Sequence, residues 1–200
     1  LCDKQFILRT DLDLDPNSAD GQVFPQAVVP VLTGVFDGQG HTISHLTVAG
    51  SNSLGLFGRL ESGAIIKDLA LVEVNITGTG SSIGALVGDN GGEVTYCYSA
   101  GTASGTEYVG GLAGANSGGV VSSHSSASVS GTDLVGGLVG DNLWSGNIVT
   151  SYSSGLVSGS RWWTGGLVGC NSGSVTQCYS MGPVSSDASA GGLVGYNWGG

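Results

Sequence analysis

Four tryptophans and one arginine are the residues of this chain best suited to binding a ligand. Trp144, Trp162 and Trp163 belong to one repeat unit that is three residues longer than its neighbours, Arg161 precedes the Trp pair, and Trp198 follows two units after Trp144. Flat aromatic rings beside polar groups suit sugar rings, and loops that bulge from a rigid scaffold often carry function. These five residues are therefore interpreted either as a glycan-binding patch or as a cover for the insertion or for a neighbouring chain.

Paired carboxylates are the second chemistry to consider, because glycosidases work with two acids. Asp89 and Asp141 occupy the same position in units two apart, so stacked strands would separate them by about 9.6 Å. That is near the upper limit for an inverting glycosidase. Ala115 lies between them, and the repeat places no Lys, Arg or His beside them. We predict no catalytic residues and expect that the chain is not an enzyme.

Metal-binding patterns in the sequence are incomplete. Glu107 and Asp133 are predicted neighbours in one column and could share a calcium ion. The run Asp11-x-Asp-x-Asp-x-Asn17 resembles a calcium loop, but Pro16 stands where that loop needs Gly and Gln22 where it needs Glu. No CxxC pair for zinc occurs. We predict no metal site and no cofactor, with calcium as an open alternative.

The histidines and cysteines form no predicted cluster. His41 and His45 are four residues apart in an extended segment, so about 13 Å separates them, which is too far to share a metal. Cys97 and Cys178 occupy one repeat position three units apart, or roughly 14 Å, which is beyond disulfide distance. We expect these two cysteines to be free thiols in packed sites.

Composition indicates a folded, acidic protein. Hydrophobic residues make up 40% of the chain and charged residues only 10%, whereas a disordered chain has few apolar residues and many charges. The formal net charge of -10 would repel a phosphate backbone, which excludes nucleic acid as a partner. No run of about 20 apolar residues is present, so we predict no membrane span.

A segment of eight residues recurs five times in the second part of the chain. The copies end at asparagines spaced by 26, 26, 29 and 26 residues: Asn90, Asn116, Asn142, Asn171 and Asn197. Such a period marks a stack in which each unit buries its apolar residues only against its neighbours. Three short apolar segments per unit, separated by Gly, Asn and Ser, predict three short strands and three corners. The predicted fold is all-β, a parallel β-solenoid (β-helix) of about six coils with three short strands per coil.

Aligned units place equivalent residues in columns. A leucine column is expected in the core together with two Val-rich columns, and it contains Leu86, Leu112, Leu138, Leu167 and Leu193. The asparagines are expected to form a structural ladder at a corner, because Asn tolerates left-handed backbone and its amide can bond up and down a stack. Stacked rings are expected in a further column of Tyr98, His124, Tyr152 and Tyr179.

The first 52 residues do not follow the repeat. We predict residues 1–52 as an atypical N-terminal capping segment, and residues 53–200 as repeats of the same structural domain. The last unit stops part-way, at Asn197-Trp-Gly-Gly200. Because unpaired strands at a solenoid end recruit other strands, we expect further repeats or end-to-end self-association.

The repeats resemble a known family. Gly-Gly-Leu-Val-Gly-x-Asn at 165–171, followed by Cys-Tyr-Ser at 178–180, looks like the GLUG repeat of large bacterial surface and secreted proteins. Some of those are adhesin-like, and some are attached to immunoglobulin A-cleaving metallopeptidases. Phe36-Asp-Gly-Gln-Gly-His-Thr-Ile43 resembles the segment that precedes such repeats, and Ser123-His124-Ser125 departs from Cys-Tyr-Ser. The resemblance covers almost the whole chain and implies an extracellular or cell-surface scaffold, without specifying an activity.

Two function classes follow. The first is a non-catalytic extracellular structural or adhesive scaffold, as a cell-surface stalk or fibre-forming subunit. The second is a carbohydrate-binding or carbohydrate-active β-helix protein of the glycosidase or lyase type. An enzyme of the second class should show an acidic cluster with basic support on one face, and the sequence shows none. We favour the scaffold, with surface glycans as an open partner.

Overall fold

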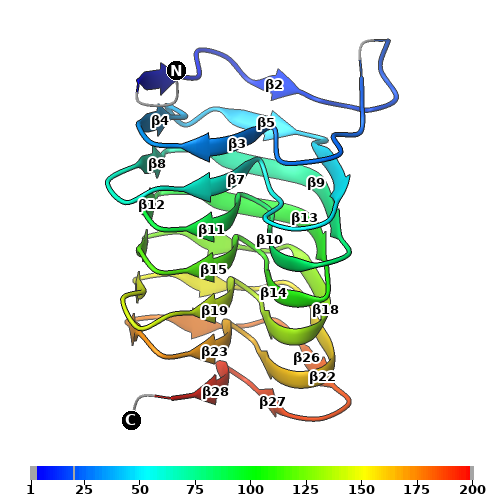
Figure 1. Cartoon of the computed structure of the whole chain (residues 1–200), viewed down its shortest axis with the longest axis vertical. Helices are drawn as coiled ribbons and strands as arrows, with labels where there is room; N and C mark the ends of the chain where they lie inside the picture. The colour runs from blue at the N-terminus through cyan, green and yellow to red at the C-terminus, as the bar shows by residue number, and fades with distance from the viewer. Residues whose placement is uncertain (1–3, 20, 199–200) are drawn as a thin grey trace.

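Short strands wind into a stack of coils, because each repeat unit carries three apolar segments separated by glycine-rich corners. The computed structural model describes residues 4–19 and 21–198. Its paired strands are parallel, and the two ends of the described chain lie at opposite ends of the stack (Figure 1). The predicted parallel β-solenoid is confirmed, and the described residues contain no helix.

Three sheets form the walls of the solenoid. Sheet A contains β1 (Gln5–Ile7), β4 (Val35–Asp37), β8 (Ile65–Lys67), β12 (Glu93–Thr95), β16 (Gly119–Val121), β20 (Asn147–Val149) and β24 (Ser174–Thr176). Sheet C contains β3 (Val29–Leu32), β7 (Phe57–Leu60), β11 (Val87–Asn90), β15 (Ala113–Asn116), β19 (Val139–Asn142), β23 (Val168–Asn171) and β28 (Val194–Asn197).

Sheet B contains the remaining strands, several of which bend around a corner. They are β2 (Leu12–Asp13), β5 (Thr42–Ser44), β6 (Thr47–Gly50), β9 (Ala70–Gly78), β10 (Ser81–Gly84), β13 (Tyr98–Ser104), β14 (Glu107–Gly110), β17 (His124–Ser125), β18 (Ser128–Gly136), β21 (Tyr152–Ser153), β22 (Val157–Gly165), β25 (Tyr179–Ser180), β26 (Val184–Ser186) and β27 (Ala190–Gly191).

The stack has about seven coils, one more than predicted. Sheets A and C each contain seven strands. The additional coil comes from the predicted capping segment, because β1 pairs with β4 and β3 pairs with β7 in the same parallel register as the repeats. Residues 1–3 of that segment, with Cys2, and residues 199–200 of the last unit lie outside the described residues.

The core is a column of aliphatic side chains inside the three walls. Leu86, Leu112, Leu138 and Leu167 have no exposed surface, so the predicted leucine column is confirmed for these four coils. In the last described coil, Leu193 is 39% exposed. The difference arises because each coil is covered by the next, and Leu193 has a neighbouring coil on one side among the described residues.

Glycine is required where each coil turns tightly into sheet C. At Gly110, Gly136 and Gly165 an added Cβ would lie 1.9 Å from the carbonyl oxygen of the residue three positions later in the chain. No side chain fits at that distance. The first glycine of the repeated eight-residue segment is therefore a steric requirement of the corner.

The asparagines form a continuous side-chain ladder at the end of sheet C. Each Nδ2 donates to the Oδ1 of the next asparagine, over 2.7 Å from Asn90 to Asn116, from Asn116 to Asn142 and from Asn142 to Asn171, and over 2.8 Å from Asn171 to Asn197. The expectation of left-handed backbone at these asparagines is wrong, because each of them is the last residue of a regular strand. Left-handed residues stand in other columns, one of which contains Ser82, Tyr108, Leu134 and Trp163.

A second ladder consists of stacked rings on sheet B. Centroid distances are 4.5 Å from Tyr98 to His124, 4.6 Å from His124 to Tyr152 and 4.8 Å from Tyr152 to Tyr179. Burial lowers the pKa of His124, which favours the neutral ring in this stack. The predicted ring ladder is confirmed.

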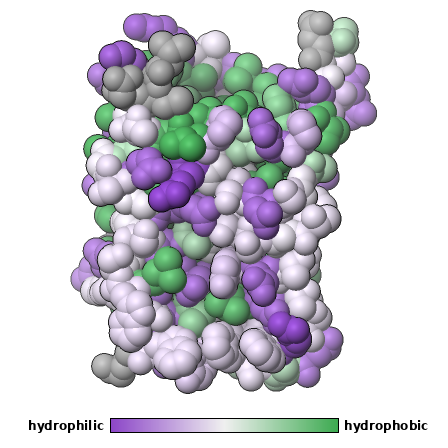
Figure 2. Space-filling model, viewed as in Figure 1, coloured by the Kyte–Doolittle hydropathy of each residue, from purple (hydrophilic) through white to green (hydrophobic). Residues whose placement is uncertain are grey.

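The outer surface is built mainly from small and weakly polar residues. Figure 2 shows pale side chains over most of one face, scattered strongly hydrophilic residues, and apolar residues gathered mainly toward the N-terminal end. In the described part of the chain, we find no helix with the length and apolarity needed to cross a membrane.

Candidate functional site

An aromatic cluster forms where the longer coil meets the coil after it. Trp162 and Trp163 lie in β22, Tyr196 lies in β28, and Trp198 follows β28. Trp163 stacks on Tyr196 with ring centroids 4.5 Å apart and an interplanar angle of 15°. Trp198 presents its edge to Tyr196 at 5.2 Å, and Trp162 lies 6.1 Å from Trp163. We refer to Trp162, Trp163, Tyr196 and Trp198 as the aromatic cluster.

An ion pair between an exposed arginine and a buried aspartate supports this cluster from one side. Asp133 is 3% exposed and accepts two hydrogen bonds from Arg161, one from Nε at 2.8 Å and a second from a terminal guanidinium nitrogen. The guanidinium carbon lies 4.6 Å from the centroid of the Trp162 ring. Asp133 raises the pKa of Arg161, which holds the guanidinium charged. Arg161 therefore pairs with Asp133, one of the two acids that the sequence offered as a shared calcium site.

The cluster borders a groove of about 320 Å³. Its polar lining includes Glu107, Tyr108 and Asp141, and Cys170 lies beside Asp141 in the register of sheet C. Burial raises the pKa of the Asp141 carboxyl to about 6. The groove thus combines exposed rings with a small number of polar groups, the composition typical of small-molecule sites.

The predicted patch is only partly assembled. Arg161, Trp162, Trp163 and Trp198 line one groove. Trp144 is 76% exposed and makes no ring contact within the described residues. Sequence reasoning missed Tyr196, although it stands in register with Cys170 and so with Asp141.

The carboxylates Asp89 and Asp141 do not converge on one site. They are in register through Ala115, as the repeat predicts, but they line two different hollows. Asp89 accepts a hydrogen bond from the Ser53 hydroxyl over 2.6 Å. The expectation that no basic residue stands beside them is wrong, because Arg59 of β7 pairs in register with Asp89. Arg59 forms its ion pair with Glu61 at 3.1 Å.

The N-terminal coils contain two separate histidine–carboxylate contacts that the sequence did not predict. His45 lies between two carboxylates, with Nδ1 2.8 Å from Asp13 and Nε2 2.5 Å from Glu73. His41 Nδ1 lies 3.1 Å from Asp11. Stacking of β2 on β5 and of β5 on β9 causes this arrangement. Asp11 and Asp13, two acids of the run that resembles a calcium loop, therefore pair with histidines. The described residues hold no group of three or more metal-ligating side chains.

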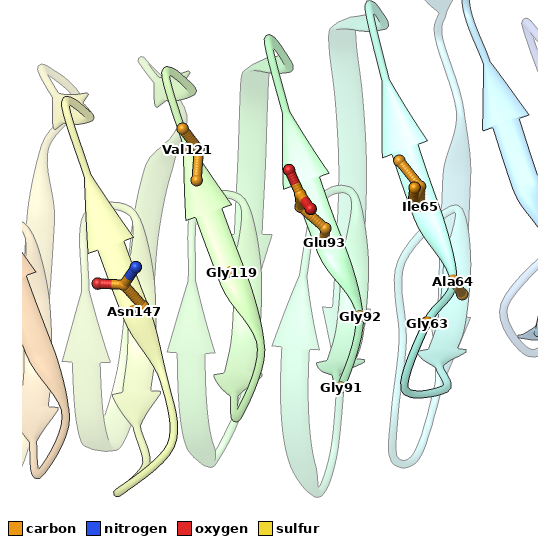
Figure 3. A pocket seen from close by; sticks show the side chains of 9 residues that line it. All are labelled: Gly63, Ala64, Ile65, Gly91, Gly92, Glu93, Gly119, Val121 and Asn147. Carbon is orange, nitrogen blue, oxygen red and sulfur yellow. The ribbon is translucent and has the colours of Figure 1, made fainter.

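A further hollow, of about 400 Å³, is a shallow groove across the start of sheet A. Its lining comes from equivalent positions in four neighbouring strands, which hold in order Ile65, Glu93, Gly119 and Asn147 (Figure 3). Glu93 is the one ionisable group in its lining. This hollow therefore lacks the two groups that acid–base chemistry needs.

Three cysteines of the described chain are free thiols, namely Cys97, Cys170 and Cys178. Cys97 is buried, and burial raises its pKa to about 12. A thiol in that state is a weak nucleophile. The expectation of free thiols at Cys97 and Cys178 is confirmed.

The described residues form a parallel β-solenoid repeat protein with an aromatic groove. The chain resembles the crystal structure of a Bacteroides ovatus protein provisionally described as an immunoglobulin A1 protease, with a TM-score of 0.78 and 22% identity. The match covers 96% of this chain and 67% of that one, and at this identity it shows the fold alone.

One sequence relative was found among characterised proteins. The chain is 38% identical over 79 residues to halomucin of Haloquadratum walsbyi. The match spans 38% of this chain and 1% of the length of halomucin. No protein-family model matches the chain.

Proposed function

We propose that the chain is a rigid, non-catalytic scaffold segment of an extracellular or cell-surface protein, built from repeats of the GLUG type. The observation that carries this proposal is the continuity of the stack. The asparagine ladder joins five successive coils, and the ring ladder joins four. Such a stack holds its two ends at a fixed separation, about 30 Å for seven coils.

An extracellular location is supported by the kinds of protein that the chain resembles. The sequence relative is named halomucin, and the fold neighbour is provisionally named an immunoglobulin A1 protease. A surface of small polar residues suits a spacer in contact with water. The net charge of -10 would cause copies lying side by side to repel one another. Within this proposal, the scaffold serves as an adhesin stalk or as a subunit of a fibre.

End-to-end association is the form of assembly that the scaffold favours. Strand β28 pairs with β23 on one side, and within the described residues it has no strand on the other. The backbone groups on that side can accept a further coil or a second copy. Static light scattering at rising protein concentration tests this, with growing linear particles expected. A particle of constant monomer mass would contradict the association.

A non-catalytic role is supported by the separation of the two candidate acids into different hollows. The test is release of reducing ends or unsaturated products from a panel of neutral and acidic polysaccharides, where no turnover is expected. Turnover that Asp141→Asn abolishes would overturn the proposal in favour of an enzyme. Carbohydrate binding is a second candidate function, and the aromatic groove is the observation that favours it.

A further inference from the structure

The groove beside the aromatic cluster has the features of a built binding site. We infer that it binds an uncharged oligosaccharide, with the exposed face of Trp162 as the stacking platform. Figure 1 shows β22 and β28 together at the C-terminal end of the stack. This inference deepens the second candidate function and is independent of the scaffold role.

The first argument is that the platform is held in place without a ligand. Trp162 is 53% exposed, yet the Arg161 guanidinium lies 4.6 Å from its ring centroid. Arg161 in turn is held by two hydrogen bonds to Asp133, whose carboxylate is buried. An exposed indole fixed in this way loses little further conformational freedom when it binds.

The second argument is that the ring next to the platform is also fixed. Trp163 stacks on Tyr196 with ring centroids 4.5 Å apart and makes an edge contact with Trp198 at 6.3 Å. Its left-handed backbone belongs to the corner of the fold, since Ser82, Tyr108 and Leu134 have the same conformation in the preceding coils. The packed rings therefore form one side of the groove before a ligand binds.

The third argument concerns the polar groups. Glu107, Tyr108 and Asp141 line the same groove as the rings. A pyranose presents apolar C–H faces and equatorial hydroxyls, so it can stack on an indole while its hydroxyls reach these groups. With its pKa raised to about 6, Asp141 donates a hydrogen bond when protonated and accepts when ionised.

Charge decides which sugars fit. The one cation of the groove, Arg161, is already neutralised by Asp133. Glu107 and Asp141 add acidic groups to the groove, and the chain carries a net charge of -10. An acidic polysaccharide would be repelled. Charge therefore excludes acidic glycans, and the exposed indole fits the apolar face of a neutral sugar.

The experiment is a titration of the purified chain with neutral hexasaccharides of the gluco, galacto, manno, xylo and N-acetylglucosamine series. Hexagalacturonate is the anionic probe, and a chitosan hexamer is the cationic one. Tryptophan fluorescence and calorimetry report binding. We expect saturable binding of at least one neutral probe and none of the anionic probe. Binding of the anionic or cationic probe alone, or of no probe, would overturn the inference.

Variants assign the site. Trp162→Ala removes an exposed ring and should weaken binding by about tenfold or more, the loss expected for a central aromatic contact. Trp144→Ala is the matched control, since Trp144 is also exposed but lies outside the groove, and its affinity should equal wild type. Equal losses in both variants would remove the groove as the site. A melting temperature within about 2 °C of that of the wild type shows that each variant is folded. A loss of binding is then distinguished from a loss of the solenoid fold on which the scaffold role depends.

Discussion

The asparagine ladder leads to a quantitative prediction for Asn116→Ala. Asn116 is fully buried in the middle of the stack. Its Oδ1 accepts from Asn90 Nδ2 over 2.7 Å, and its Nδ2 donates to Asn142 Oδ1 over 2.7 Å. Alanine removes both bonds, together with a longer one from Asn116 Nδ2 to the Gly118 carbonyl oxygen at 3.3 Å, an acceptor that keeps its bond from the Asn147 N–H. It also leaves Asn142 Oδ1 buried without that donor, whereas Asn90 Nδ2 keeps its bond to the Gly119 carbonyl at 3.1 Å.

The expected loss follows from those contacts. Each hydrogen bond contributes about 1 kcal/mol net, and a buried acceptor left without its donor costs about 1–3 kcal/mol. Asn116→Ala should therefore reduce the free energy of unfolding by about 3 kcal/mol. For a chain of this size each kcal/mol lowers the melting temperature by about 2–4 °C, so the shift should be about 6–12 °C.

Thermal unfolding followed by circular dichroism measures the shift. Asn147→Ala is the control, because Asn147 is an exposed asparagine on the coil next to that of Asn116, and exposed substitutions change stability by no more than about 0.5 kcal/mol. If Asn116→Ala had the same melting temperature as Asn147→Ala, the ladder would contribute nothing to stability, and its role in the scaffold would be refuted.

Three further predictions follow from the core, the groove and the thiols. Leu138→Asp buries an unpartnered charge and should remove the cooperative transition of the surrounding coils; an unchanged melting temperature would place Leu138 outside the core. Burial raises the pKa of Asp141 from 3.8 to about 6, so the folded state holds a proton that the unfolded state releases. The stability from this group falls as pH rises through that window, and Asp141→Asn should flatten the slope in urea titrations between about pH 4 and 7. Since burial raises the pKa of Cys97 to about 12, iodoacetamide at about pH 8 should spare native Cys97 in peptide mass mapping, and early labelling there would show that its coil opens.

The columns that follow the repeat could be predicted from the sequence. Leu112 and Asn116 recur at a constant interval, and a parallel stack with constant register places equal positions above one another. Spacing alone therefore predicts the leucine core, the ring ladder and the partners of each asparagine side chain.

The contacts that sequence reasoning missed arise where the register changes. The register between β18 and β22 shifts after Gly131, so that Asp133 pairs with Trp162. The side chain of Arg161, one residue earlier in β22, then bonds to Asp133. An alignment locates an additional residue only to within a few positions, so it does not show this ion pair. Arg59 and His45 were missed for a related reason, because both lie in coils whose lengths differ from the repeat.

The constant register also bears on how such a chain changes length in evolution. Asn90 and Asn116 occupy the same place in successive coils, 26 residues apart. Deleting residues 91–116 would join Asn90 to Ser117, which recreates the junction that Asn116 makes now. Recombination between misaligned repeats can thus add or remove whole coils without creating a new loop. The number of coils is therefore free to drift, while the groove stays tied to the coil with the additional residues and to its neighbours on both sides.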